Sequence, residues 1–507
     1  MSAIVGIDLG TTFSAIAVVN KHGKPEIISN REGERITPSV VLFDSDGPIV
    51  GTMAKRSAVA SPLNVVQFVK RQMGDPSWKF RTEQGATFIP EEISAIILRR
   101  LKEDAETMMG GPVHDAVVTV PAYFNDAQRK ATLDAGKIAG LNVIRIINEP
   151  TAAALAYGID KAQGKQTVLV YDLGGGTFDV TIMRLEHGAI DVVATGGDKN
   201  LGGFDWDNEV MRYLNEEFKK QGGADLLDDP TLEQDLRDKA EIAKKTLSTR
   251  DKTTVFLSAG GKSASISVTL AQFDALTASL LKRTATIMTH VLEDAGLEWA
   301  AVDKVLLVGG STRMKAVPAL IERTAGKKPS AEVHPDEVVA LGAAFQGMIL
   351  NVEAGKADLV ERDAFPLVEI KDVNSHSMGV IAVDDQGREH NAIVLKKDTV
   401  IPCKVSDTFC TVVDKQNQLL VQVTQGEDSD PAYVVILGEA TMAIPPYPKG
   451  APLEVFFEYD HNGNVHVTVV DLTAKRSLGE MPIVRKSNRT AEEVRNMQSK
   501  LSRMSVN

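Results

Sequence analysis

Cysteine is scarce in this chain, which has only Cys403 and Cys410 among its 507 residues. Two thiols provide neither a disulfide framework nor a thiolate metal site, so we expect both to be structural. The sequence also lacks any run of roughly 18 apolar residues, and no charged N-terminal segment precedes a long apolar stretch. These absences argue against a membrane span and a secretory signal, and they predict a cytoplasmic protein.

Basic residues are outnumbered by acidic ones, with 56 Lys and Arg against 68 Asp and Glu and a formal net charge of −12. Because contacts to nucleic acid phosphates need a basic face, this balance argues against nucleic acid as the main partner. The hydrophobic share of 43% and charged share of 24% are those of an ordinary globular protein. A chain of this length has room for about three domains or subdomains.

One motif occurs twice in the N-terminal half of the chain. The first copy reads IVGIDLGTTFSAIAVV around Asp8, and the second reads VLVYDLGGGTFDVTI around Asp172. In each copy, an apolar strand-like run leads into a turn of Gly and Thr and then into a second apolar run. Glycine lets the backbone N–H groups of a turn approach a ligand closely, and the Thr hydroxyls add donors. Two such turns in equivalent places predict a pair of phosphate clamps that close on one nucleotide.

Strand-like and helix-like segments alternate up to about residue 352, which indicates an α/β fold. Residues 114–120 and 142–147 are predicted strands, and a helix that begins with a capping box of Asn125 and Gln128 is predicted between them. Residues 304–308 form another predicted strand, followed by the turn GGSTR and a helix. A strand, a Gly-rich turn and a helix N-terminus together favour anions.

Seven segments resemble, in order and spacing, those of the seventy-kilodalton heat-shock chaperones, the DnaK or Hsp70 family. They read IDLGTT, VPAYFNDAQRKAT, INEPTAAALAYG, DLGGGTFDV, LGGFDWD, VGGSTRM and HPDEVVALGAA. Actin and the sugar kinases share the two clamps but lack the VPAYFNDAQR and NEPTAAALAYG pair. The resemblance implies an α/β chain with an actin-like, two-lobed ATPase domain, an antiparallel β-sandwich and a short C-terminal helix.

The resemblance also implies four parts along the chain. They are an ATPase domain, an interdomain linker, a peptide-binding β-sandwich and a truncated lid helix, at residues 1–355, 356–373, 374–488 and 489–507. The linker sequence VEIKDV carries charge at two positions where the family has an aliphatic run, which predicts weaker or altered coupling between domains. The family's lid is much longer, so the chain resembles a short member or one cut before most of the lid.

The C-terminal helix has its own local signals. Thr490 and Glu493 form a predicted capping box, and one narrow apolar face follows, made of Val494, Met497, Leu501 and Met504.

Catalytic roles are implied by the resemblance at five positions. Asp8 and Asp172 would lie near Mg²⁺, mostly through its waters, because Mg²⁺ gives up its hydration shell reluctantly. Lys70 would orient the attacking water and offset charge on the γ-phosphoryl group, although taken alone it has the features of a solvated surface lysine. Glu149 would position water or metal, and Thr177 would contact the γ-phosphate. Positioning and charge suffice for phosphoryl transfer, with water as the acceptor.

Further ATP or ADP contacts follow from the same resemblance. Around the phosphates the matching positions are Gly10, Thr11, Thr12, Phe13, Gly174, Gly175, Gly176, Asp179, Gly202 and Gly203. The remaining nucleotide positions are Glu241, Lys244, Ser248, Gly309, Gly310, Ser311, Arg313 and Asp336. Three of these, Glu241, Lys244 and Ser248, share one face of a predicted helix, a pattern that on its own is more typical of a solvated charged face. By the same resemblance, Arg313 would stack on the base.

From about residue 376 the pattern changes to short alternating strands, which predicts an antiparallel β-sandwich of roughly 110 residues. The clearest predicted strands are residues 378–383, 408–413, 419–423, 453–459 and 465–470, with a turn at 461–464. Extended peptides bind such domains through backbone hydrogen bonds and an apolar pocket. By resemblance the groove is lined by Val380, Ala382, Val383, Phe409, Val412, Leu419, Val421 and Ile444, although each is also consistent with sandwich core.

The sequence therefore predicts an ATP-hydrolysing stress-response chaperone that binds exposed apolar segments of unfolded clients. Its implied partners are client peptides, a J-domain co-chaperone and a nucleotide-exchange factor, with neither nucleic acid nor membrane. Positions that match the family's coupling and J-domain contacts are Pro121, Tyr123, Asn125, Asp126, Arg145 and Asp372. Two alternatives remain: a weakly hydrolysing regulator, holdase or exchange factor, and a small-molecule kinase of the same superfamily.

Overall fold

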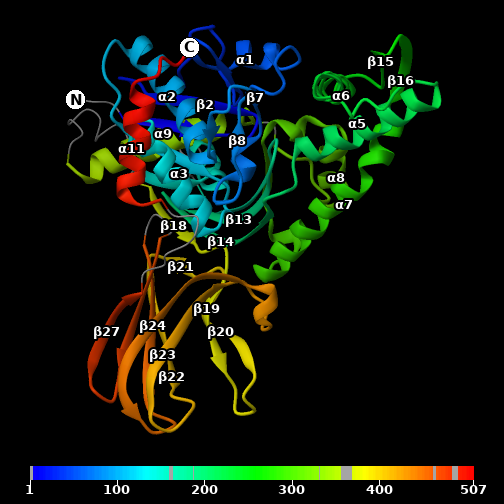
Figure 1. Ribbon diagram of the computed structural model, residues 1–507. Coiled ribbons are helices and arrows are strands. Elements are labelled where there is room, and N and C mark those ends of the chain that lie inside the picture. The colour runs from blue at the N-terminus through cyan, green and yellow to red at the C-terminus, as the bar shows by residue number, and fades with distance from the viewer. Residues whose placement is uncertain are drawn as a thin grey trace. The chain divides into compact units, whose positions relative to one another are not determined.

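The structure is a computed structural model that describes residues 4–158, 164–186, 188–330, 332–355, 368–460, 464–481 and 489–507 (Figure 1). Its residues form two compact units. Unit 1 comprises residues 1–122, 132–370 and 489–507, and unit 2 comprises residues 123–131 and 371–488. Most of the predicted linker, at 356–367, and the first three residues of the predicted turn at 461–464 lie outside the described residues.

Unit 1 contains two sheets of similar topology. In the first, the strand order is β11-β10-β1-β2-β3, and β4 pairs with β2. The strands β1 and β2 form an antiparallel hairpin, whereas β10 runs parallel to β1 on its other side. The bounds are β1 (Val5–Asp8), β2 (Phe13–Val19), β3 (Pro25–Ile27), β4 (Thr37–Pro38), β10 (Asp115–Val120) and β11 (Asn142–Asn148).

The second sheet repeats this hairpin with a parallel neighbour. Strands β12 and β13 are antiparallel, and β17 runs parallel to β12. The order is β17-β12-β13-β14, with β12 (Gln166–Leu173), β13 (Phe178–Glu186), β14 (Ala189–Asp198) and β17 (Lys304–Val308). We call the first sheet and its helices lobe I and the second lobe II. The repeated sequence motif is thus a repeated supersecondary unit, and its turn lies at the same end of each hairpin.

Glycine at one position lets a helix approach the first sheet closely, and glycine at another lets a second helix pack closely against the first. A Cβ at Gly6 of β1 would lie 1.9 Å from the nitrogen of Ala344, and one at Gly342 would lie 1.8 Å from the oxygen of Ala152. Only glycine fits at these two positions. The helices concerned are α4 (Glu149–Gly158) and α9 (Val338–Glu353). This packing places Glu149, the first residue of α4, at the end of β11, where the site lies.

The remaining elements of lobe I surround this sheet. They are α1 (Thr52–Ser57), α2 (Pro90–Met109), η1 (Val69–Gln72), β5 (Val41–Asp44), β6 (Gly47–Val50), β7 (Val65–Val66), β8 (Phe80–Arg81) and β9 (Thr87–Phe88). Helix α3 (Asp126–Ile138) is divided between the units, with residues 126–131 in unit 2 and the rest in unit 1. The capping box of α3 is confirmed, since Gln128 N donates to Asn125 Oδ1 at 3.0 Å and Asn125 N donates to Gln128 Oε1 at 3.1 Å.

Lobe II is built on an apolar core between its sheet and its helices. Buried Trp206 and Phe218 on α5 pack there with apolar residues of the strands. The elements are α5 (Gly203–Lys220), α6 (Pro230–Leu247), α7 (Leu270–Asp294), α8 (Ala316–Ala325), η2 (Trp299–Ala301), η3 (Gly310–Arg313), β15 (Lys252–Ala259) and β16 (Lys262–Thr269). The predicted Gly-rich turn after β17 is η3, which leads to α8.

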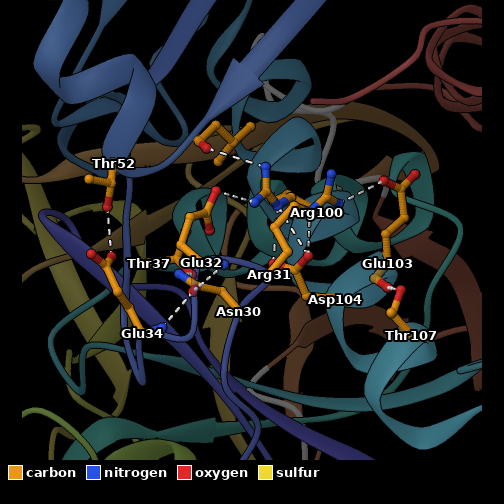
Figure 2. Close-up of polar contacts among 11 residues, drawn as sticks. Asn30, Arg31, Glu32, Glu34, Thr37, Thr52, Arg100, Glu103, Asp104 and Thr107 are labelled. Carbon is orange, nitrogen blue, oxygen red and sulfur yellow. Dashed lines mark hydrogen bonds and ion pairs between the residues drawn. The ribbon is translucent and has the colours of Figure 1, made fainter.

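An ion-pair network fixes the loop after β3 to α2 (Figure 2). The guanidinium group of Arg100 is almost fully buried, and it donates to Glu32 Oε1 at 2.7 Å and to Asp104 Oδ2 at 3.0 Å. A buried cation needs such partners, because an unpaired one would carry a large desolvation cost. The same loop carries Arg35, whose Nη2 lies 2.7 Å from Oε2 of Glu337, the residue before α9. The loop is therefore held between α2 and α9.

The C-terminal helix α11 (Ala491–Ser502) packs beside α2 within unit 1 (Figure 1). Its capping box is confirmed, since Glu493 N donates to Thr490 Oγ1 at 3.1 Å and Thr490 N donates to Glu493 Oε2 at 2.7 Å. Lys500 Nζ lies 2.7 Å from Glu92 Oε1 of α2, and Arg99 of α2 donates to the backbone oxygen of Leu501. The sequence predicted this helix and its apolar face but not the surface on which it packs.

Unit 2 contains a sandwich of two antiparallel four-stranded sheets, in the orders β20-β19-β23-β24 and β22-β25-β26-β27. The apolar faces of both sheets supply its core, in which Phe457 and Val467 are fully buried. Strand β18, which comes before β19, pairs antiparallel with β21, which lies between β20 and β22 in the sequence. The bounds are β18 (Glu369–Val373), β19 (Met378–Val383), β20 (Glu389–Leu395), β21 (Val400–Ile401), β22 (Cys403–Cys410), β23 (Gln416–Gln425), η4 (Pro431–Tyr433), β24 (Val435–Tyr447), β25 (Pro452–Tyr459), β26 (Val465–Asp471) and β27 (Arg476–Met481).

Strand β22 differs from its predicted range of 408–413, because it begins earlier and ends at Cys410. Beyond it the chain turns, and the backbone nitrogen of Val412 donates to the side chain of Gln416 at 2.8 Å instead of to a neighbouring strand. Lys415 in this turn has a positive φ of 58°, which breaks the extended conformation. Both cysteines of β22 are free thiols, and Cys410 is exposed.

Candidate functional site

A cavity of about 680 Å³ lies in unit 1, where the hairpin turn of β1–β2 faces that of β12–β13. Nearly all the predicted nucleotide-site residues line it: Asp8, Gly10, Thr11, Thr12, Phe13, Lys70, Glu149, Asp172, Gly174, Gly175, Thr177, Gly203, Glu241, Lys244, Ser248, Gly309, Gly310, Ser311, Arg313 and Asp336. Gly176, Asp179 and Gly202 do not line it. Segments from across the ATPase region thus meet at one cavity of the size that holds a small molecule.

The two Gly-Thr turns lie in close contact. A Cβ at Gly175 would lie 1.8 Å from Oγ1 of Thr12, so only glycine fits at this point. Gly176 and Gly202 lie behind the turn, where a Cβ at Gly202 would lie 2.5 Å from the nitrogen of Gly176. The second turn is closed by a hydrogen bond of 3.1 Å from Gly174 N to the oxygen of Thr177. Backbone amides and Thr hydroxyls therefore converge on the space in which a phosphate chain would lie.

Lys70 is a buried residue, so the interpretation of it as a solvated surface lysine is wrong. Its side chain is 6% exposed, and its Nζ lies 2.5 Å from Oε1 of Glu149, whose side chain is 10% exposed. Lys70 comes from η1, whereas Glu149 begins α4 at the end of β11. The packing of α4 against α9 and the short η1 turn thus bring opposite charges together inside the cavity.

Two further carboxylates lie at the ends of the equivalent strands β1 and β12. Burial, with repulsion from Glu149, raises the pKa of Asp8 to about 7, although Lys70 opposes the shift. Burial raises the pKa of Asp172 well above its usual range, and repulsion from Glu149, Asp179 and Asp8 adds to this effect. Asp8 also accepts a hydrogen bond of 3.2 Å from Thr119 Oγ1. A divalent cation with its waters would relieve this repulsion.

The described residues contain no group of three or more His, Cys, Asp or Glu side chains arranged to hold a metal ion. Mg²⁺ needs no such group, because it keeps several waters and binds through one or two carboxylates together with substrate phosphates. Asp8 and Asp172, on opposite turns of the cavity, are therefore suited to hold a hydrated Mg²⁺ bound to a phosphate chain.

Glu241 of α6 lies between two lysines at the other end of the cavity. Its Oε2 is 2.6 Å from Lys55 Nζ of α1, and its Oε1 is 2.6 Å from Lys245 Nζ. Burial opposes ionisation of Glu241, but the two ammonium groups outweigh it and lower its pKa to about 2. Because α1 belongs to lobe I and α6 to lobe II, the Lys55–Glu241 pair joins the lobes.

Lys244 and Arg313, on the same side of the cavity, have protein partners of their own. Lys244 Nζ donates to the oxygen of Gly203 at 2.9 Å and lies 2.8 Å from Oδ2 of Asp207. Arg313 Nη2 lies 2.6 Å from Oδ2 of Asp336. The predicted contacts of these side chains to a nucleoside stay predictions.

Several cavity residues were not predicted from the sequence: Ile36, Phe68, Phe204, Asp207, Lys245, Thr249, Val308, Met314, Pro335 and Val339. Lys245 was detectable, because it lies four residues after Glu241 on the same helical face. Phe204 follows Gly203 directly on α5, and Asp207 comes one helical turn after Gly203. Their spacing from this predicted site residue could also have indicated them. Nothing in the sequence indicated that Phe68 would line the cavity, because its position depends on a left-handed backbone conformation with φ 58°.

The predicted groove residues fall into two groups in unit 2. Val380, Val421 and Ile444 are buried, and the first two belong to the apolar core of the sandwich. In contrast, Val383 and Val412 are 41% and 42% exposed, and Ala382, Phe409 and Leu419 are partly exposed. A bound peptide would therefore first contact the second group.

The predicted coupling positions are spread over several elements. Asn125 caps α3, and Asp126 begins it. Arg145 is on β11, and Asp372 is on β18, where its Oδ1 accepts the backbone N–H of Val373 at 2.8 Å. The roles of these residues in coupling stay predictions.

No helix in the described part of the chain is both long and apolar enough to cross a membrane. The family model described as Hsp70 protein matches residues 4–507, nearly the whole chain. This match confirms the resemblance in the sequence, together with the fold class of a two-lobed α/β ATPase domain followed by a β-sandwich. The chain therefore belongs to the Hsp70 family of nucleotide-binding chaperones, whose members are ATPases.

Proposed function

We propose that this protein is a chaperone that hydrolyses ATP and uses the nucleotide state of unit 1 to control the affinity of unit 2 for apolar client segments. The observation that carries the proposal is the buried Lys70–Glu149 pair, at 2.5 Å, in a cavity that also contains Asp8 and Asp172. A cation, a general-base candidate and two phosphate-binding turns in one cavity are the parts that hydrolytic phosphoryl transfer needs.

The side chains of the cavity would act in two ways: they position the phosphates and the attacking water, and they neutralise the developing charge. Thr11, Thr12 and Thr177, with the amides of both turns, hold the phosphates, and Lys70 offsets the charge that develops on the transferred group. Glu149 holds Lys70 in place and orients the attacking water. A bound Mg²⁺ would supply positive charge that neutralises part of the charge on the phosphates. Asp8 and Asp172 would hold that ion through its waters.

Unit 2 supplies the client-binding part of the proposal. Its exposed and half-exposed apolar side chains, including Val383, Val412 and Leu419, suit an extended peptide whose backbone pairs with the sandwich. The J-domain and exchange-factor partners, like the cytoplasmic location, remain predictions from the sequence and the family.

ATP turnover measured with and without an unfolded, Leu-rich peptide tests the proposal. We expect slow, Mg²⁺-dependent hydrolysis that the peptide accelerates, because coupling between two ligand sites is reciprocal. Binding of ATP without any turnover would instead support the regulator or holdase alternative, and phosphorylation of a small molecule would support a kinase. The buried Lys70–Glu149 pair argues for turnover.

A further inference from the structure

The ring of Phe204, on the wall of the nucleotide cavity, lies between two guanidinium groups. The Cζ atoms of Arg71 and Arg237 are 4.6 Å and 4.9 Å from its centroid. The ring of Phe68 meets it edge-on, with centroids 4.8 Å apart and planes at 61°. These are the geometries of two cation–π contacts and one edge-to-face aromatic contact.

These contacts join the two lobes beside the site. Phe204 is in the first turn of α5 in lobe II, and its backbone nitrogen donates to the oxygen of Gly175 at 2.8 Å. Arg71 directly follows Lys70 in η1 of lobe I, and its Nη1 lies 3.3 Å from Oδ1 of Asp205. One side of the cluster is thus attached to the second phosphate turn, and the other is attached to the turn that carries Lys70.

Phe68 adds a conformational reason for this arrangement. It precedes η1 with φ 58° and ψ 24°, a left-handed conformation that is unfavourable for a residue with a Cβ. The contact with Phe204 offsets this cost, because it requires the ring of Phe68 to point toward α5. The direction in which the chain enters η1, and with it the position of Lys70 two residues later, therefore depends on the ring of Phe204.

We propose that Phe204 is a positioning residue that braces the Lys70 turn against the second phosphate turn, and that this brace slows the release of ADP. The inference rests on the proposed function, since it concerns the same ATP site. Removal of the ring would let η1 move relative to the phosphates, which lowers the rate of hydrolysis. It would also weaken an interlobe contact at the cavity wall, which speeds nucleotide release.

The test compares Phe204→Ala with the conservative variant Phe204→Tyr and with Phe256→Ala, which removes a ring that is 70% exposed on β15. Single-turnover hydrolysis of ATP and dissociation of a fluorescent ADP are measured for the full chain. For Phe204→Ala we expect hydrolysis about tenfold slower and ADP release about tenfold faster, while the other two stay close to the parent. A purely structural ring would lower the melting temperature without opposite changes in the two rates.

A second variant approaches the contact from the other lobe. Arg71→Met keeps an unbranched apolar stem but removes the guanidinium group, and we expect both rates to change in the same directions as in Phe204→Ala. The double variant should change them by less than the sum of the single effects, because the two substitutions share the contact between Arg71 and Phe204. If Phe204→Ala does not fold, Phe204→Leu, which retains apolar volume without an aromatic ring, takes its place.

The outcomes separate this inference from the proposed function. A parent that hydrolyses ATP, with Phe204 variants whose two rates equal those of the parent, would overturn the brace and leave the proposed function intact. Additive effects in the double variant would also overturn it. A parent that neither binds nor hydrolyses ATP would overturn both.

Discussion

Lys70 and Glu149 form an ion pair of 2.5 Å inside the cavity, although 79 positions separate them in the sequence. Both side chains are nearly buried, so the pair needs further polar surroundings to offset the loss of water around two charges. Lys70 in turn opposes the rise in the pKa of Asp8 and Asp172, which line the same cavity. The cavity thus contains one lysine cation suited to a phosphoryl group, and a set of carboxylates suited to a hydrated divalent ion.

Thr177 is expected to make the conformation of the chain depend on whether a γ-phosphate is bound. Its hydroxyl would contact the γ-phosphate of ATP, which ADP lacks. A ligand shifts a conformational equilibrium only through contacts that differ between the two states. Thr177→Ala should therefore bind both nucleotides but give one protease digestion pattern in either. The parent should give two distinct patterns, and identical parent patterns in ATP and ADP would contradict the expectation.

The Lys55–Glu241 pair predicts a pH dependence of stability. The pKa of Glu241 is lowered to about 2 in the folded chain, so its ionised form stabilises the fold above the unfolded value of about 4.3. This contribution is lost as the pH falls from that value through the folded pKa. Unfolding free energies measured down to about pH 3 should fall less steeply for Glu241→Gln than for the parent. The control Glu293→Gln, exposed on α7, should follow the parent, and parallel curves for all three would contradict the assignment.

Val412 tests the peptide groove without a change in the sandwich core. A Leu-rich heptapeptide should bind the parent with micromolar affinity, about −8 kcal/mol. Val412→Asp should weaken binding, because a carboxylate would lose its water against an apolar peptide. The control is Val435→Asp, at the first residue of β24, whose side chain is 54% exposed against 42% for Val412. Fluorescence anisotropy measures both, and equal affinities would place the groove elsewhere.

Val421 suits this experiment less well, because it is 4% exposed and belongs to the sandwich core. The sequence predicted Val421 as a groove residue, and in such a groove Val421→Phe would fill the peptide pocket. In the structure, we expect the larger ring to overpack the core and to destabilise unit 2 by about 1–3 kcal/mol. Thermal unfolding of the variant measures this effect, and an unchanged melting temperature with weaker peptide binding would restore the groove interpretation.

Local features of the fold were predictable from the sequence because their causes are local. The capping boxes of Asn125 with Gln128 and of Thr490 with Glu493 require only neighbouring residues, and both are present. The paired Asp-Leu-Gly turns predicted that two turns would meet at one site, and residues of both turns line the same cavity. The family resemblance then supplied positions that spacing alone left ambiguous.

Contacts between distant segments were not predictable in this way. Lys55 is on α1, far in sequence from Glu241, and nothing near either residue indicates the pair. Similarly, the amphipathic face of α11 predicts burial but not the partner, which is α2. The proposed role of Phe204 depends on its contacts with Arg71 and Phe68, which both belong to the other lobe. Such pairings depend on how the lobes close and not on local propensity.

Lys70→Ala tests the central claim most directly, with Lys262→Ala on the exposed face of β16 as the control. Phosphate release is measured in single turnover with Mg²⁺, and ATP binding is measured by calorimetry on the same samples. We predict that Lys70→Ala loses at least about a hundredfold in rate yet still binds ATP, because the lysine acts on the transferred phosphoryl group more than on the rest of the nucleotide. Lys262→Ala should match the parent. Hydrolysis by Lys70→Ala at the parent rate would show that this cavity is not the catalytic site that the account describes.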